Sequence, residues 1–173
     1  MTMGITTRRR RGLVGMIGAV GGVALLVAGC GSSSSGTSSS TGTSSASSST
    51  VTISTTSVAG LGTVLVDAQG RTLYMFEPDK HAKVTCTGSC ASVWPPAQLS
   101  GTQKPAAAGG AKSTLLGSDP NPSGGKVVTY AGWPLYTYVA DSAPGTAHGQ
   151  ALKINGGLWY VMAASGAIVT KKP

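Results

Sequence analysis

From residue 58 onward, short apolar stretches alternate with clusters of turn-forming residues, and no long stretch has the 3.6-residue period of a helix. This pattern is typical of β-strands joined by tight turns. We therefore expect an antiparallel β domain in this part of the chain. Three hairpins are predicted, with a strand, a turn and a second strand at 63–67, 68–70 and 71–76; at 126–130, 131–132 and 133–139; and at 157–162, 163–166 and 167–170.

The first two predicted hairpins contain the same pattern, G-x-x-L-Y-x-aromatic-x-x-D. It occurs at 70–79 and again at 132–141, so the two copies lie 62 residues apart. Five matched positions in so short a window are not expected by chance in a chain with one Phe and five Tyr. The pattern indicates a duplicated unit, with repeat halves at about 61–96 and 126–162.

Each copy places two aromatic side chains on one face of its second strand, because residues two apart in a strand point the same way. The pairs are Tyr74 with Phe76 and Tyr136 with Tyr138. Large rings bury much apolar area, and this chain is poor in Phe and Ile, so we expect the four rings to form the core or the seam between the halves. A ligand-stacking platform on an open sheet face is the alternative.

Two further pairs of residues fit the duplication. Asp79 and Asp141 follow the two aromatic pairs beyond the predicted strand ends. There an aspartate carboxylate accepts hydrogen bonds from nearby backbone N–H groups; the alternative is a pseudo-symmetric carboxylate pair that binds a cation or performs acid–base chemistry. Trp94 and Trp159, at similar distances after the motif tyrosines, are predicted to be equivalent core residues.

The stretch between the first two hairpins is less regular. A single helical turn is predicted at 89–93, because prolines 95 and 96 follow directly after Trp94 and end it. Loops rich in Pro, Gly and Ala are expected at 98–110 and 117–125, with a short strand at 113–116. The predicted fold is thus a mostly β domain over 58–173, built from antiparallel hairpins in two pseudo-symmetric halves.

The N-terminal 29 residues have the organisation of an export signal. Four arginines at 8–11 precede an apolar stretch at 12–28. The sequence Val27-Ala28-Gly29-Cys30 resembles the bacterial lipobox, in which the cysteine becomes the lipidated first residue of the mature protein. We expect Cys30 to carry that lipid; a plain secretory peptide and an uncleaved membrane span are the alternatives.

Residues 30–57 form the predicted link between this anchor and the β domain. They are nearly all Ser, Thr and Gly. A segment of this composition buries too little apolar surface to offset its conformational entropy, so we expect a disordered linker.

The net charge of +8 falls to +4 once the four leader arginines are removed. The remaining lysines are scattered and form no basic stripe with interleaved aromatic residues, which argues against a nucleic-acid partner. Two histidines, at 81 and 148, lie in loop-like stretches, and no nucleophile motif accompanies them. No catalytic residue, metal or cofactor is predicted.

Cys86 and Cys90 form a C-x3-C pair in a chain with the features of an exported protein. Oxidising surroundings favour a disulfide between them, and Gly88 gives the short loop room to close. The alternative is a thiol pair that is redox-active or binds a soft metal such as Cu(I).

Taken together, these motifs resemble a family of predicted bacterial lipoproteins described as a secreted repeat of unknown function. The resemblance rests on the two Y-x-[FWY]-x-x-D motifs, on 86–91, on 94–96 and on 132–136. It implies the repeat fold and an exported location, and it transfers no catalytic residues. The loop at 117–125 is richer in Pro and Gly than the family pattern suggests.

We therefore expect a lipid-anchored protein at the outer face of the cell membrane or in the cell envelope. Its β-rich domain would be a non-enzymatic binding or structural module, with the membrane and a protein or small molecule as partners. The alternative is a redox or copper-handling lipoprotein that uses Cys86 and Cys90.

Overall fold

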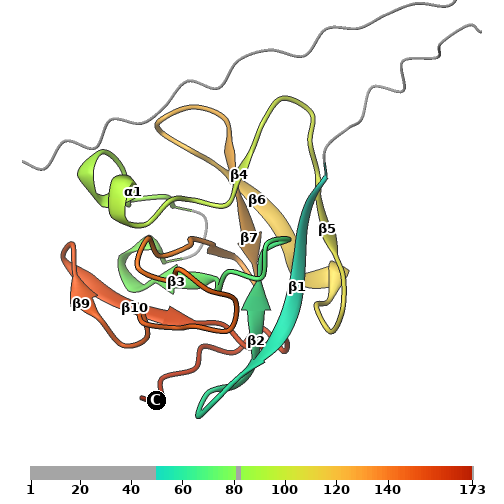
Figure 1. Cartoon of the computed structure of the whole chain (residues 1–173). Helices are drawn as coiled ribbons and strands as arrows, with labels where there is room; N and C mark the ends of the chain where they lie inside the picture. Colours follow the sequence, from blue (N-terminus) through green and yellow to red (C-terminus); the bar gives the residue numbers. More distant parts are fainter. Residues whose placement is uncertain (1–49, 81–82, 173) are drawn as a thin grey trace, which may run out of the picture. The chain divides into compact units, whose positions relative to one another are not determined.

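The structure is a computed structural model that describes residues 50–80 and 83–172. All of these residues belong to one compact unit (Figure 1). The predicted signal segment at 1–29, most of the predicted linker and the first histidine lie outside the described residues. Among the described residues, no helix is long and apolar enough to cross a membrane.

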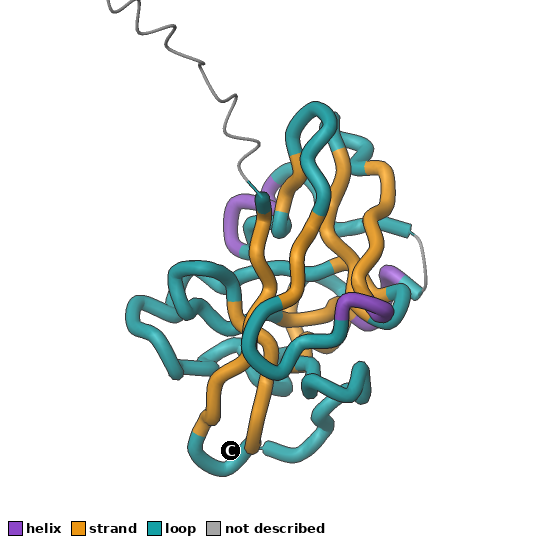
Figure 2. Tube along the Cα trace, turned by 90° about the vertical axis from the view of Figure 1, so that its right-hand side faces the viewer, coloured by secondary structure: helices purple, strands orange, loops and turns teal. Residues whose placement is uncertain are grey.

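Short strands dominate the described part of the chain, and loops of varied length separate them (Figure 2). The strands are β1 Val51–Val58, β2 Gly62–Val66, β3 Tyr74–Phe76, β4 Gln98–Leu99, β5 Pro105–Ala107, β6 Leu116–Pro120, β7 Lys126–Tyr130, β8 Trp133–Pro134, β9 Lys153–Ile154 and β10 Gly157–Val161. The helical elements are α1 Ser89–Val93 and two 3-10 turns, η1 Glu77–Asp79 and η2 Ser113–Leu115.

The strands form three small sheets, ordered β2-β1-β5, β3-β10-β9 and β4-β7-β6, with β8 paired to β7. The pairs are antiparallel except β1 with β5, which is parallel. Isolated bridges connect the sheets, among them Val64 with Ala163 and Tyr74 with Tyr136. The prediction of a mostly antiparallel β domain is confirmed.

Strand β1 lies inside the predicted linker, so the predicted boundary at residue 57 is wrong. Ile53 is fully buried and Val58 nearly so, and the Ser and Thr residues between them pair with β2 from Ser54 to Ser57. Threonine and the β-branched apolar residues favour strands. Low overall hydrophobicity therefore concealed a strand whose few apolar side chains reach the core.

The predicted hairpins are present but shorter than expected. After the turn at 68–70, the chain pairs with β2 only at the bridge between Val66 and Thr72, and β3 then pairs with β10. All three residues of β3 are buried, and a strand buried on both faces needs a partner from elsewhere in the chain. The second strands of the other two hairpins are limited to β8 and to a bridge from Met162 to Ile168.

The stretch between the repeats contains more regular structure than predicted. The helical turn at Ser89–Val93 is confirmed as α1, whereas strands β4, β5 and β6 occupy parts of the two predicted loops. The predicted strand at 113–116 is wrong, because η2 precedes β6 there. Within β6, the position of Gly117 requires a residue without a side chain, because a Cβ there would lie 2.8 Å from Oγ1 of Thr129 on β7.

Two clusters of buried side chains form the core, and alternate residues of the first repeat point into each. Tyr74 and Phe76 belong to an aromatic cluster shared by both repeats. Leu73 and Met75 belong to a mainly aliphatic cluster that includes Ile53 of β1. This division confirms the predicted faces and places the repeated aromatic residues between the two halves.

Candidate functional site

The two motif tyrosines pair with each other through the backbone. The N–H of Tyr74 donates to the carbonyl of Tyr136 at 2.8 Å, and the N–H of Tyr136 donates to the carbonyl of Tyr74 at 2.9 Å. This reciprocal antiparallel bridge relates equivalent residues of the two repeats. It therefore marks the point where the halves meet.

The side chains of the motif cross from one repeat to the other. The hydroxyl of Tyr74 donates to Oδ2 of Asp141 at 2.5 Å, and the hydroxyl of Tyr136 donates to Oδ2 of Asp79 at 2.5 Å. Both tyrosines and Asp79 are fully buried, and Asp141 is 5% exposed. Each motif thus supplies the donor for the other motif's carboxylate and the acceptor for its hydroxyl.

The second oxygen of each carboxylate is bound by its own repeat. Oδ1 of Asp79 accepts from the backbone N–H of Thr85 at 2.8 Å and from its hydroxyl at 2.6 Å. Oδ1 of Asp141 accepts from the backbone N–H of His148 at 2.8 Å and lies 3.2 Å from Nδ1 of that histidine. The predicted bonds to local backbone N–H groups are therefore present in both repeats.

The environment of the two tyrosine hydroxyls keeps them protonated in the crossed hydrogen bonds. Burial raises the pKa of Tyr74 and of Tyr136 well above the ordinary value for a phenol, and the bonds to Asp141 and Asp79 raise it further. Burial also raises the pKa of Asp79, while hydrogen bonds from Thr85 and Tyr136 oppose that rise. Both hydroxyls consequently remain protonated donors.

Four rings stack in a row that alternates between the repeats. Phe76 stacks on Trp159 with centroids 4.1 Å apart, Trp159 on Trp94 at 3.8 Å, and Trp94 on Tyr138 at 4.3 Å. Each tyrosine of the bridge meets the tryptophan of its own repeat edge-on at 5.3 Å. These geometries are favourable for aromatic rings.

The aromatic residues are therefore packing elements. Trp94, Trp159 and Tyr136 are fully buried and Phe76 is 2% exposed, and Tyr138 packs against the same cluster. The prediction of a core or seam is confirmed. A ligand-stacking platform is contradicted for the buried rings, because a ligand has no access to them.

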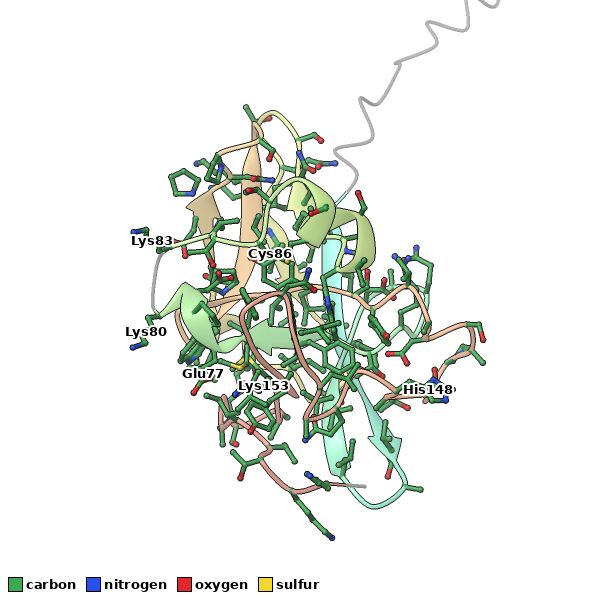
Figure 3. The ribbon with its side chains drawn as sticks, turned by 90° about the vertical axis from the view of Figure 1, so that its left-hand side faces the viewer. Glu77, Lys80, Lys83, Cys86, His148 and Lys153 are labelled. Carbon is green, nitrogen blue, oxygen red and sulfur yellow. A yellow bond between two sulfur atoms is a disulfide. The ribbon has the colours of Figure 1, made fainter. Side chains whose placement is uncertain are left out.

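Cys86 and Cys90 are joined by a disulfide, with their Cα atoms 5.2 Å apart. The bond connects the first residues of α1 to the segment that follows Asp79, and Cys86 is buried against the aromatic cluster. Figure 3 shows Cys86 within the molecule, whereas His148 lies towards one outer edge and Lys80 and Lys83 lie towards the other. The predicted disulfide is confirmed, and both sulfur atoms are used in it.

Asp79 and Asp141 are buried, and their carboxylate oxygens already accept hydrogen bonds from the protein. This does not support the alternative that they bind a cation or perform acid–base chemistry. Among the described residues, no group of three or more His, Cys, Asp or Glu side chains could hold a metal ion. Sequence reasoning missed the crossed tyrosine partners. The signal available was the motif's composition, since a buried tyrosine hydroxyl needs an acceptor and each motif brings one carboxylate.

The crossed arrangement predicts which substitutions interact energetically. Tyr74→Phe leaves a carboxylate oxygen of buried Asp141 without its donor and should lower the free energy of unfolding by about 1–3 kcal/mol. In a double-mutant cycle measured by urea unfolding, Tyr74→Phe and Asp141→Asn should show a coupling energy of about 1–3 kcal/mol.

The matched control combines Tyr74→Phe with Asp79→Asn, the aspartate of the same motif. Those two effects should add to within about 0.5 kcal/mol, because Tyr74 does not bond Asp79. Coupling to Asp79 in place of Asp141 would contradict the crossed pairing.

The raised tyrosine pKa values predict a loss of stability in alkali. An unfolded chain releases a phenol proton near pH 10, whereas folded Tyr74 retains its proton, so stability that is present below that pH is lost as the pH rises above it. The wild-type free energy of unfolding should fall more steeply above pH 10 than that of Tyr74→Phe, by up to about 1.4 kcal/mol per pH unit. Equal slopes in urea titrations at several pH values would exclude a raised pKa.

Comparison with known proteins agrees with the duplicated architecture. The family described as "secreted repeat of unknown function" matches residues 55–98 and 120–163, which together make up about half of the chain. No curated protein and no solved structure matches the chain. Each matched segment contains one copy of the crossed tyrosine and aspartate. Because the two segments together cover about half of the chain, the chain belongs to the family of secreted repeats of unknown function.

Proposed function

We propose that this protein is a lipid-anchored module displayed at the outer face of the cell membrane, and that it binds or supports other envelope components without catalysing a reaction. The observation that carries the proposal is the crossed pairing of Tyr74 with Asp141 and of Tyr136 with Asp79. The residues that define the family motif hold the two repeats together. Contacts with other molecules are then left to loops and strand edges.

Export is supported by the family description, which names a secreted repeat. Anchoring is supported by the sequence Val27-Ala28-Gly29-Cys30 and by the arginines at 8–11. Arginines that precede an apolar segment stay on the cytoplasmic side. That orientation would leave the β domain on the outer side of the membrane, connected through Cys30 to the lipid.

The redox or copper-handling alternative is not favoured by a specific observation. Cys86 and Cys90 are bonded to each other, and the sulfur-bearing side chain of Cys86 packs within the aromatic cluster. A disulfide that closes so short a loop constrains the chain locally. This supports a structural role, in which the bond positions the segment that carries Thr85 against Asp79.

Replacing the predicted lipidated residue tests the proposal. In cells that make the full chain, the wild-type protein should be in the membrane fraction, and its mass should show a diacylated N-terminal Cys30. Cys30→Ser should release the protein from the membrane or leave its leader uncleaved, whereas the neighbouring Ser32→Ala should behave as wild type. An unmodified wild-type product that begins at another residue would contradict the anchor.

A further inference from the structure

Two neighbouring strands of the domain are edge strands of different sheets and do not pair with each other. β5 is the edge of the sheet β2-β1-β5, and β6 is the edge of the sheet β4-β7-β6. The two strands lie next to each other (Figure 1). Unpaired strand edges present backbone N–H and C=O groups to which another extended chain can bind.

The register of β6 identifies a backbone position that does not bond β7. Val128 of β7 donates its N–H to Ala97 and accepts at its carbonyl from Leu135, so its backbone groups point away from β6. Ser118 is directly opposite Val128. In an antiparallel ladder, facing residues either exchange both hydrogen bonds or neither. The N–H and C=O of Ser118 therefore point away from β7, towards the free edge.

The same argument applies to β5. Ala107 lies opposite Ile53 in the parallel pair with β1, and the carbonyl of Ile53 accepts from the N–H of Ala108. In a parallel ladder a residue bonds the two neighbours of its opposite residue. The N–H and C=O of Ala107 are thus directed away from β1 and towards the second free edge.

A groove of about 780 Å³ lies along this seam. Ala107 and Ser118 both line it, together with the loop 101–104, and its charged lining residues are Lys104 and Lys126. No carboxylate is among its described lining residues. Asp119 follows Ser118 but points to the opposite face of β6, where it lies near Asp79.

We propose that this groove binds a short, extended, acidic peptide segment of a partner protein. The peptide backbone would bond one of the two free edges, at Ser118 or at Ala107, as in other cases of strand addition to a sheet edge, because β5 and β6 lie too close together for one added strand to pair with both. Lys104 and Lys126 would bind its carboxylates. The inference rests on the proposed function, because it names the partner class of the displayed module.

The chemistry of the seam favours a peptide over another polyanion. Both Ala107 and Ser118 offer a donor and an acceptor, which match the alternating groups of a peptide backbone, whereas a polyphosphate offers acceptors only. Prolines at 105 and 120 lie in the two edge strands. They lack an N–H and so limit pairing to a short segment.

Fluorescence anisotropy with the purified full chain in detergent micelles tests this proposal. The probe is a labelled peptide of alternating glutamate and threonine residues. It should bind saturably, and a peptide of alternating lysine and threonine should not. The same acidic peptide with alternate backbone nitrogens methylated keeps its charge but loses half of its donors, and it should bind at least about tenfold more weakly.

Charge reversal in the groove provides the second measurement. Lys104→Glu combined with Lys126→Glu should weaken binding of the acidic peptide by about tenfold or more. The matched control, Lys153→Glu with Lys172→Glu, makes the same change in net charge at two exposed lysines outside the groove and should change the affinity by less than about threefold.

Three results would overturn the proposal: no saturable binding of the acidic peptide, equal binding of the methylated peptide, or equal weakening by the two charge-reversal pairs. Equal binding of the methylated peptide would indicate a general affinity for polyanions. None of these results would affect the lipid anchor, which the Cys30→Ser experiment tests separately.

Discussion

The crossed hydrogen bonds between motif tyrosines and aspartates are the constraint on which the rest of the domain depends. A buried carboxylate and a buried phenol are each unfavourable without a hydrogen-bond partner. Tyr74 finds its partner in Asp141, and Tyr136 finds its partner in Asp79. Neither repeat contains both members of a crossed pair, so a repeat by itself would leave its tyrosine hydroxyl and one oxygen of its carboxylate without these partners. The two halves are therefore parts of one cooperative structure.

Stacking of Trp94 on Trp159 at the same interface adds an apolar contact to the polar one. The repeats differ mainly in how each carboxylate is supported from its own side. In the first repeat Thr85 supports Asp79 next to the Cys86–Cys90 disulfide, and in the second His148 supports Asp141 from a largely exposed position. The shared motif holds the two halves together, so features outside that motif are the better candidates for function. The seam between β5 and β6 is one of them, since it lies in the stretch between the two matched repeats.

The sequence predicted the duplication, the aromatic faces and the disulfide because each depends on residue types at fixed local spacing. It did not predict that β3 would pair with β10, or that Tyr74 would bond the aspartate of the other repeat, because these choices depend on which distant segments meet. Strand β1 was missed since Ser and Thr suit both a linker and a strand, and only Ile53 and Val58 mark its buried side. Strands β5 and β6 were missed because prolines at their ends and Gly117 favour loops in isolation. In the structure, pairing with β1 and β7 overrides those local preferences.

Native-state hydrogen exchange of the full chain tests most directly whether the two repeats form one cooperative unit. The amides of Tyr74 and Tyr136 bond each other's carbonyls across the interface. The account predicts that both amides, with those of β7 and β10, exchange through the same global opening, with one free energy and one dependence on denaturant. Exchange of one repeat through a partial opening of lower free energy, while the other repeat stays protected, would contradict it.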